Sequence, residues 1–139
     1  MEKSIFDTGF LFAYLDDKDR YYSECNALMP LVLPGALLPD VVLPELAYLI
    51  LRELDVKTLS KFLRSVANGD FELVHTNRSD LERAAQILEK YNDNNIDLVD
   101  AVIVAMSERL KITRILTIDR RHFSIFKPEH CEAFELLPQ

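Results

Sequence analysis

Short apolar segments alternate along this chain with longer segments of helical periodicity, and this alternation limits the fold more than any other feature. Residues 2–6, 71–75, 112–119 and 133–138 are short, rich in apolar side chains and predicted to be strands. They lack the regular polar and apolar alternation of a half-exposed strand, which indicates strands covered on both faces. The pattern predicts an α/β fold with a central, mainly parallel sheet.

Helices are predicted between these strands from apolar spacing, capping residues and prolines. Thr8 is the expected cap of the first helix, Pro44 marks the first turn of the third, and Ser79 with Glu82 has the spacing of a capping box. The predicted helices cover residues 8–15, 20–33, 44–54, 57–67, 79–91 and 97–110.

The length and composition are those of a single soluble domain spanning residues 1–139. Hydrophobic residues make up 49% and charged residues 28% of the 139 residues, and charges interrupt every apolar run before the roughly 18 residues that a membrane span requires. The N-terminus lacks the pattern of a signal peptide, and Cys25 and Cys131 lie far apart. We therefore expect a cytoplasmic protein with free thiols and no membrane contact.

The formal net charge is −7, from 23 acidic and 16 basic residues. This balance argues against a protein that coats nucleic acid with a broad basic face. It is compatible with an enzyme that acts on nucleic acid, because carboxylates gathered around divalent cations add negative formal charge while the bound metal attracts phosphate.

Four acidic residues are predicted to converge on one edge of the sheet. Asp7 and Asp119 each follow a predicted strand, whereas Glu45 and Asp100 each lie in the first turn of a predicted helix. The carboxyl ends of parallel strands and the N-termini of the following helices meet at the same edge, where ligands bind. Taken singly, each acid could be a helix cap or a turn residue.

Such a cluster of acids points to a metal site. Several carboxylates within a few ångström cannot all stay ionised unless a cation neutralises them. Oxygen ligands suit Mg²⁺ or Mn²⁺, which keep coordination positions for water and phosphate oxygens. The reaction that this site favours is hydrolysis of a phosphodiester bond.

The segments "FDTGFLFAYLD", "LPELAYLI", "IDLVDAVIVAMSERL", "RILTIDRRHF" and "FELLP", in this order and at these separations, resemble the PIN-domain family, and in particular the VapC-like toxins of toxin–antitoxin pairs. The resemblance implies a PIN-like, three-layer α/β/α fold. It also implies an endoribonuclease that depends on Mg²⁺ or Mn²⁺, is held inactive by a small antitoxin of the VapB type and forms a homodimer.

Carried over residue by residue, the resemblance places the four acids of the family on Asp7, Glu45, Asp100 and Asp119, as catalytic residues and metal ligands. Thr8 matches a hydroxyl residue that helps to position metal-bound water. Asp97 is either the N-cap of its helix or an outer-shell ligand.

Three residues follow the last acid directly. Arg120 and Arg121 either contact RNA phosphates or belong to a solvated turn. His122 is expected to be structural.

Two other functions are consistent with parts of the pattern. A phosphatase of the haloacid-dehalogenase type also begins with an aspartate after its first strand, but Gly9 stands where its second acid is expected. The other is a PIN-like interaction or nucleic-acid-binding module without activity, which the presence of all four acids argues against.

Overall fold

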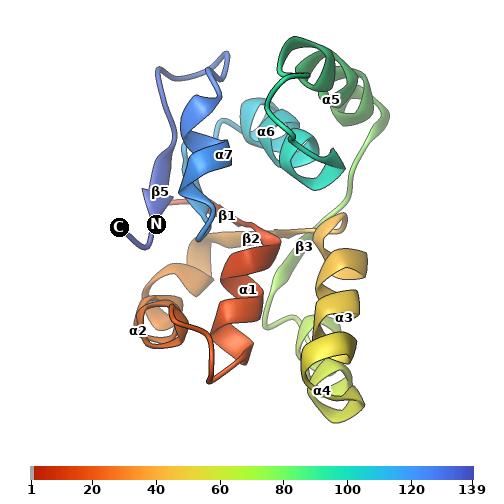
Figure 1. Cartoon of the computed structure of the whole chain (residues 1–139), viewed down its shortest axis with the longest axis vertical. Helices are drawn as coiled ribbons and strands as arrows, with labels where there is room; N and C mark the ends of the chain where they lie inside the picture. The colour runs from red at the N-terminus through yellow and green to blue at the C-terminus, as the bar shows by residue number, and fades with distance from the viewer. Residues whose placement is uncertain (1) are drawn as a thin grey trace.

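The computed structural model describes residues 2–139, in which a five-stranded sheet runs through the centre of the molecule (Figure 1). Every pair of neighbouring strands is parallel, and the strand order is β3-β2-β1-β4-β5. The strands are β1 (Ser4–Phe6), β2 (Ala36–Pro39), β3 (Glu72–Val74), β4 (Arg114–Leu116) and β5 (Glu135–Leu137). The prediction of a mainly parallel central sheet is confirmed.

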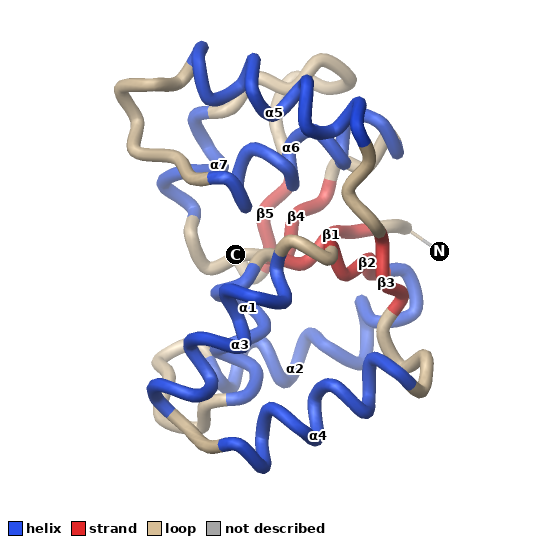
Figure 2. Tube along the Cα trace, turned by 90° about the vertical axis from the view of Figure 1, so that its right-hand side faces the viewer, coloured by secondary structure: helices blue, strands red, loops and turns tan. Residues whose placement is uncertain are grey.

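Helices cover both faces of the sheet and complete three layers (Figures 1 and 2). One face carries α1 (Thr8–Leu15), α2 (Tyr22–Val32), α3 (Val42–Glu53) and α4 (Val56–Ala67), with a 3₁₀ turn at Leu33–Gly35. The other face carries α5 (Arg78–Lys90), α6 (Leu98–Leu110) and α7 (Arg120–Ile125). This is the expected α/β/α arrangement.

The structure corrects several predicted boundaries. The strand β2 was not predicted, because Pro34 before it and Pro39 at its end were interpreted as the end of the preceding helix. The helix α3 begins at Val42, two residues before the predicted start at residue 44. Pro44 is the third residue of that helix, where its missing N–H has no intrahelical partner to lose. Residues 120–122 form the first turn of α7 and not a solvated turn.

Two predicted caps are wrong by one or two residues. Asp7, not Thr8, caps α1, and its Oδ1 accepts the Thr8 amide at 2.8 Å. Asn77, not Ser79, caps α5, and its capping-box partner is Asp80, whose carboxylate accepts the Asn77 amide at 3.0 Å. Ser79 and Thr8 already lie within their helices, so they cannot take the extended backbone of a cap.

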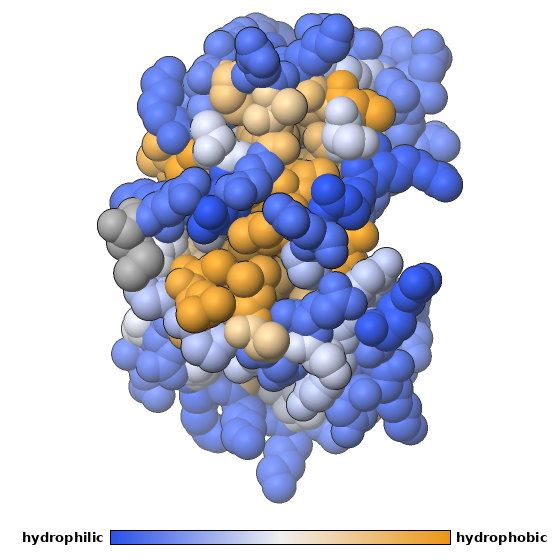
Figure 3. Space-filling model, turned by 90° about the vertical axis from the view of Figure 1, so that its left-hand side faces the viewer, coloured by the Kyte–Doolittle hydropathy of each residue, from blue (hydrophilic) through white to orange (hydrophobic). Residues whose placement is uncertain are grey.

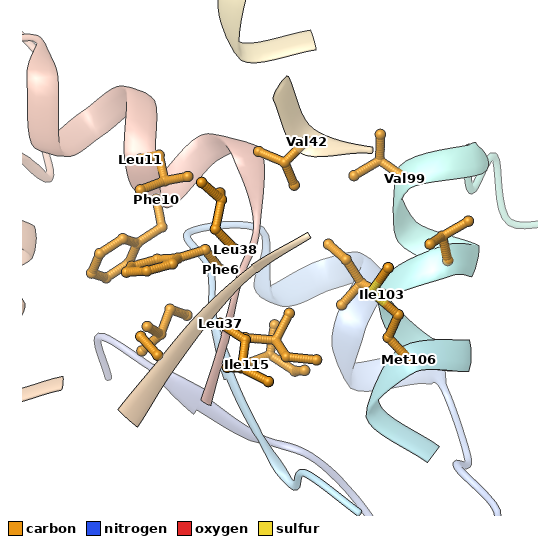
Figure 4. Close-up of a cluster of buried hydrophobic side chains, with 14 of the residues drawn as sticks. Phe6, Phe10, Leu11, Leu37, Leu38, Val42, Val99, Ile103, Met106 and Ile115 are labelled. Carbon is orange, nitrogen blue, oxygen red and sulfur yellow. The ribbon is translucent and has the colours of Figure 1, made fainter. Parts of the chain in front are cut away.

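The core forms on both sides of the sheet (Figure 4). Phe6 packs towards Phe10 of α1, with ring centroids 5.6 Å apart. On the other face, Ile115 faces Ile103 and Met106 of α6 (Figure 4). All five side chains are fully buried. The apolar character of α6 on every side follows from its position, since residues 99–108 of this helix are buried without a break.

The face in Figure 3 carries an apolar patch beside the C-terminal strand. Here α2 and the chain end border a shallow hollow of about 400 Å³ that includes Leu28, Leu31, Leu137 and Pro138. Leu31 is 73% exposed. In the part of the chain that the structure describes, no helix combines the length and the apolar character needed to cross a membrane.

Two ion pairs connect helix α5 to helix α6. Asp80, which is 1% exposed, binds the Arg109 guanidinium through both of its oxygens, at 2.8 and 2.9 Å. Glu108 binds Arg83 in the same two-pronged way, at 2.7 and 3.1 Å. A buried carboxylate is stable only while it is paired. The position of α6, whose first turn carries Asp100, therefore depends on these pairs.

We expect Arg109→Met to lower the free energy of unfolding by about 2 kcal/mol, because it leaves Asp80 buried and charged without its partner. Adding Asp80→Asn should restore part of the loss, since asparagine keeps the cap and removes the charge. Urea unfolding at pH 7 measures both effects. Arg52→Met is the matched control: it breaks an exposed pair with Glu53 and should change stability by less than about 0.5 kcal/mol. Equal effects of the two arginine substitutions would contradict this.

Candidate active site

The pairing of β1 with β4 brings the first and last predicted acids together. Asp7 follows β1 directly, and its amide donates to the Leu116 carbonyl at 2.9 Å. Thr117 links Asp7 to Asp119: its hydroxyl donates to Asp7 Oδ2 at 2.7 Å and accepts the Asp119 amide at 2.9 Å. Thr117 is fully buried. The sequence analysis missed it, although it lies between the strand and the acid.

Gly9 allows α1 to begin this close to the β4 side of the sheet. A Cβ at this position would lie 3.0 Å from the Ile118 side chain. The glycine two residues after Asp7 thus has a packing reason, and helix α1 starts directly at the sheet edge that carries Asp7.

Two helix N-termini bring the other predicted acids. Asp97 caps α6 by accepting the Asp100 amide at 2.9 Å, and Asp100 accepts the Asp97 amide at 3.2 Å. Of the two roles left open for Asp97, the structure shows the cap. Glu45 lies in the first turn of α3, as predicted, and is half-buried.

The electrostatics show that these acids influence one another. The pKa of Asp7 is raised from 3.8 to about 6, mainly by burial; the hydrogen bonds from Thr117 and the Thr8 amide lower it, and the charges of Asp119 and Glu45 add smaller increases. Burial, and then the charge of Asp97, raise the pKa of Asp100 to about 8, with smaller contributions from Asp7 and Asp119. The four predicted acids thus form one electrostatic cluster in which burial and mutual repulsion disfavour the ionised forms of Asp7 and Asp100.

His122, which the sequence analysis expected to be structural, lies against this cluster. Its Nδ1 lies 2.8 Å from Asp119 Oδ2 and 3.5 Å from Asp100 Oδ2. The signal in the sequence was the three-residue spacing from Asp119, which places the two side chains on one face only if residues 120–125 are helical.

The two arginines after Asp119 have different surroundings. The Arg120 guanidinium donates to the backbone carbonyls of Leu136 and Pro138, at 3.2 and 3.0 Å, and so binds the end of β5. Arg121 is exposed on α7.

The donor set fits a hard divalent cation. Among residues 2–139, no group of three or more His, Cys, Asp or Glu side chains is already gathered as an ion site. The cluster nevertheless offers carboxyl oxygens, which are the donor type that Mg²⁺ and Mn²⁺ prefer, and a bound cation would favour their ionised form. The Thr8 hydroxyl beside Asp7 is buried and has no hydrogen-bond partner within the described residues. A buried polar atom of this kind favours a bound water or ion nearby.

Comparison with known proteins decides the family. The family model of the PIN domain matches residues 4–127. The chain belongs to the PIN domain family. The match includes Asp7, Glu45, Asp100 and Asp119, and the resemblance seen in the sequence is confirmed.

This PIN domain is similar to VapC proteins in sequence and in fold. It is 32% identical over 134 residues to Ribonuclease VapC26 of Mycobacterium tuberculosis, covering 96% of this chain and 99% of that protein. The crystal structure of M. tuberculosis VapC20, a Sarcin-Ricin loop cleaving toxin, has a TM-score of 0.80 at 18% identity and covers 86% of this chain and 92% of its own. DNA-bound VapBC from Salmonella typhimurium has a TM-score of 0.74 at 15% identity, covering 98% of both chains. These two structures show that the fold is shared.

The raised pKa of Asp7 predicts a pH-dependent stability in the metal-free protein. The folded state holds the Asp7 proton more tightly than the unfolded chain, so this contribution to stability is complete below pH 3.8 and is lost as the pH rises to about 6. At pH 8 with EDTA, Asp7→Asn should therefore be more stable than the wild type by about 3 kcal/mol. Asparagine can still cap α1.

Chemical unfolding at pH 4 and pH 8 measures this gain, which should be small at the lower pH. Asp17→Asn, at an exposed position, serves as the control. A wild type as stable as Asp7→Asn at pH 8 would show that the ionised Asp7 carboxylate does not destabilise the folded state.

Proposed function

We propose that this PIN domain is an endoribonuclease that uses Mg²⁺ or Mn²⁺ to hydrolyse RNA phosphodiester bonds, and that it is the toxin of a toxin–antitoxin pair. The observation that carries the proposal is the cluster of Asp7, Asp100, Asp119 and Glu45 at one sheet edge, where burial and the neighbouring acids raise the pKa of Asp7 and Asp100. The similarity to a named ribonuclease over nearly the whole chain supports it. We also propose that residues 1–139 act as one domain.

The proposed metal ligands are Asp7, Asp100 and Asp119, with Glu45 as a fourth carboxylate. When bound, the cation would polarise the phosphate and assist the attacking water. The protein supplies the orientation of these ligands. Thr117 and the first amide of α1 hold both Asp7 oxygens, at 2.7 and 2.8 Å. Asp97 is proposed to act through its cap, which positions Asp100, and Thr8 to position a water with its unpaired hydroxyl.

Arg121 is the stronger of the two proposed RNA contacts. It is exposed at the start of α7, two residues after Asp119, where a guanidinium can reach a phosphate. Arg120 already donates to the β5 carbonyls, so any contact it makes with RNA uses its remaining N–H groups.

The proposed partners are a small antitoxin of the VapB type and a second copy of the chain, both acting with it in the cytoplasm. The solved relatives include VapBC from Salmonella typhimurium and a toxin–antitoxin complex from Klebsiella pneumoniae. The surface offers apolar side chains to protein partners: on α3 and α4, Tyr48, Leu51 and Val56 are 60%, 51% and 71% exposed. Exposed groups of this kind are typical of interaction sites.

Membership of the PIN family favours this proposal over the phosphatase that the sequence analysis left open. The remaining alternative is a PIN-like interaction module without activity. Metal binding and RNA cleavage distinguish the two, because a module without activity has no need of a functional acid cluster.

We expect Asp7→Asn and Asp100→Asn to lose Mn²⁺ binding in calorimetry while remaining folded. Glu45→Gln and Asp119→Asn keep the shape of the side chain and remove its charge. Each should lower metal affinity or the rate of cleavage of a single-stranded RNA by roughly 10- to 100-fold.

The chain offers matched controls for both kinds of substitution. Glu53→Gln changes an exposed glutamate at the other end of α3, and Asp17→Asn changes an exposed aspartate. Both should cleave RNA at the wild-type rate. A wild-type rate for Asp119→Asn or Glu45→Gln in excess Mn²⁺ would remove that residue from the site, and unchanged Mn²⁺ binding in both Asp7→Asn and Asp100→Asn would refute the metal centre.

Expression of the wild-type chain alone should arrest bacterial growth, because an unrestrained ribonuclease depletes RNA that translation needs. Expression of Asp7→Asn at the same protein level should not arrest growth. Growth curves after induction, with immunoblots to match protein levels, measure this difference. Equal growth with the two versions would count against a toxin.

A further inference from the structure

We propose that His122 is a positioning residue for the acid cluster: its ring N–H holds the Asp119 carboxylate and spaces it from Asp100, and thereby sets the affinity of the site for a divalent cation. This inference rests on the proposed function. It concerns a residue that lies outside the four acids carried over from the family.

One residue orients the whole Asp119 carboxylate. The His122 backbone amide donates to Asp119 Oδ1 at 3.1 Å, and the His122 ring Nδ1 lies 2.8 Å from Asp119 Oδ2. The backbone of Asp119 is held separately, since its amide donates to Thr117 at 2.9 Å. The direction in which the Asp119 carboxylate points therefore depends on His122.

The same ring nitrogen also faces the second acid. Nδ1 lies 3.5 Å from Asp100 Oδ2, so this one nitrogen stands between a carboxylate of α6 and the carboxylate that caps α7. A proton on Nδ1 offsets the repulsion that would otherwise move the two acids apart. A neutral imidazole can carry its proton on Nδ1, so the contact does not need a charged ring.

The His122 ring is attached to a helix whose position is fixed by packing in the core. His122 lies in the first turn of α7, and its neighbour Phe123 is 1% exposed in the core, where its ring packs 5.8 Å from that of Phe126. The side chain of His122 itself is 27% exposed. Ligand-orienting groups work best when packing fixes their own position.

The loss of an orienting partner typically lowers metal affinity or activity by about 10- to 100-fold. We therefore expect His122→Leu to weaken Mn²⁺ binding by this factor. His122→Asn keeps an N–H donor close to the position of Nδ1, so its affinity should stay within about threefold of the wild type.

The experiment measures Mn²⁺ affinity by calorimetry on the full chain, with no RNA present, for the wild type, His122→Leu and His122→Asn. Thermal unfolding in EDTA shows whether each variant is folded. His75→Leu is the control, because His75 is an exposed histidine whose ring lies 3.6 Å from Asp40 and not in the acid cluster. Its affinity should equal that of the wild type.

Three results would overturn the inference. Wild-type affinity in His122→Leu would show that the ring does not position a ligand. Tighter binding would show that the ring competes with the cation. Equal weakening in the leucine and asparagine variants would show that the effect comes from the packing of α7 and not from the N–H donor.

Failure of the proposed function gives a different pattern. If the wild type binds Mn²⁺ and cleaves no RNA, the proposed reaction is wrong while the comparison of the His122 variants still decides this inference. If the wild type binds no Mn²⁺, both proposals fall. If it binds Mn²⁺ and cleaves RNA, and His122→Leu is unchanged, this inference alone falls.

Discussion

The parallel pairing of β1 with β4 is the interaction on which the candidate site depends. It joins residues 4–6 to residues 114–116 in register, so the chain positions that follow these two strands meet at one edge. The hydrogen bond from the Asp7 amide to the Leu116 carbonyl extends the ladder by one step beyond the strands, and the Thr117 hydroxyl adds a bond to the Asp7 side chain. Asp7 and Asp119, which lie far apart in the sequence, are thereby held at the same edge of the sheet.

The same arrangement of β1 and β4 buries acidic side chains, which destabilises the folded state. Asp7 and Asp100 lie where burial and neighbouring acids raise their pKa, and within residues 2–139 neither is paired with an arginine or a lysine. Elsewhere the buried carboxylates form ion pairs: on α5 and α6, Asp80 pairs with Arg109 and Glu108 pairs with Arg83. Asp80 and Glu108 therefore stabilise the fold through ion pairs. Asp7 and Asp100, whose pKa is raised, have the character of functional-site residues.

The sequence was sufficient for features that depend on local pattern, and insufficient where tertiary contacts decide. The apolar run of α6, the strand before Asp119 and the first-turn position of Glu45 were predicted, because each follows from burial or capping preferences. The strand β2 was missed because its proline outweighs its short apolar run. The contacts of Thr117 and His122 with the acids were not predicted, because they exist only once β4 lies against β1 and residues 120–125 coil into a helix.

The contact of Arg120 with the carbonyls of β5 bears on how the protein is made. The guanidinium ties the last strand to α7, the helix that also carries His122. During translation the strand with Asp7 leaves the ribosome well before Asp119, which follows more than a hundred residues later in the chain. The acid cluster therefore assembles only after β4 and α7 have been synthesised and β4 has paired with β1.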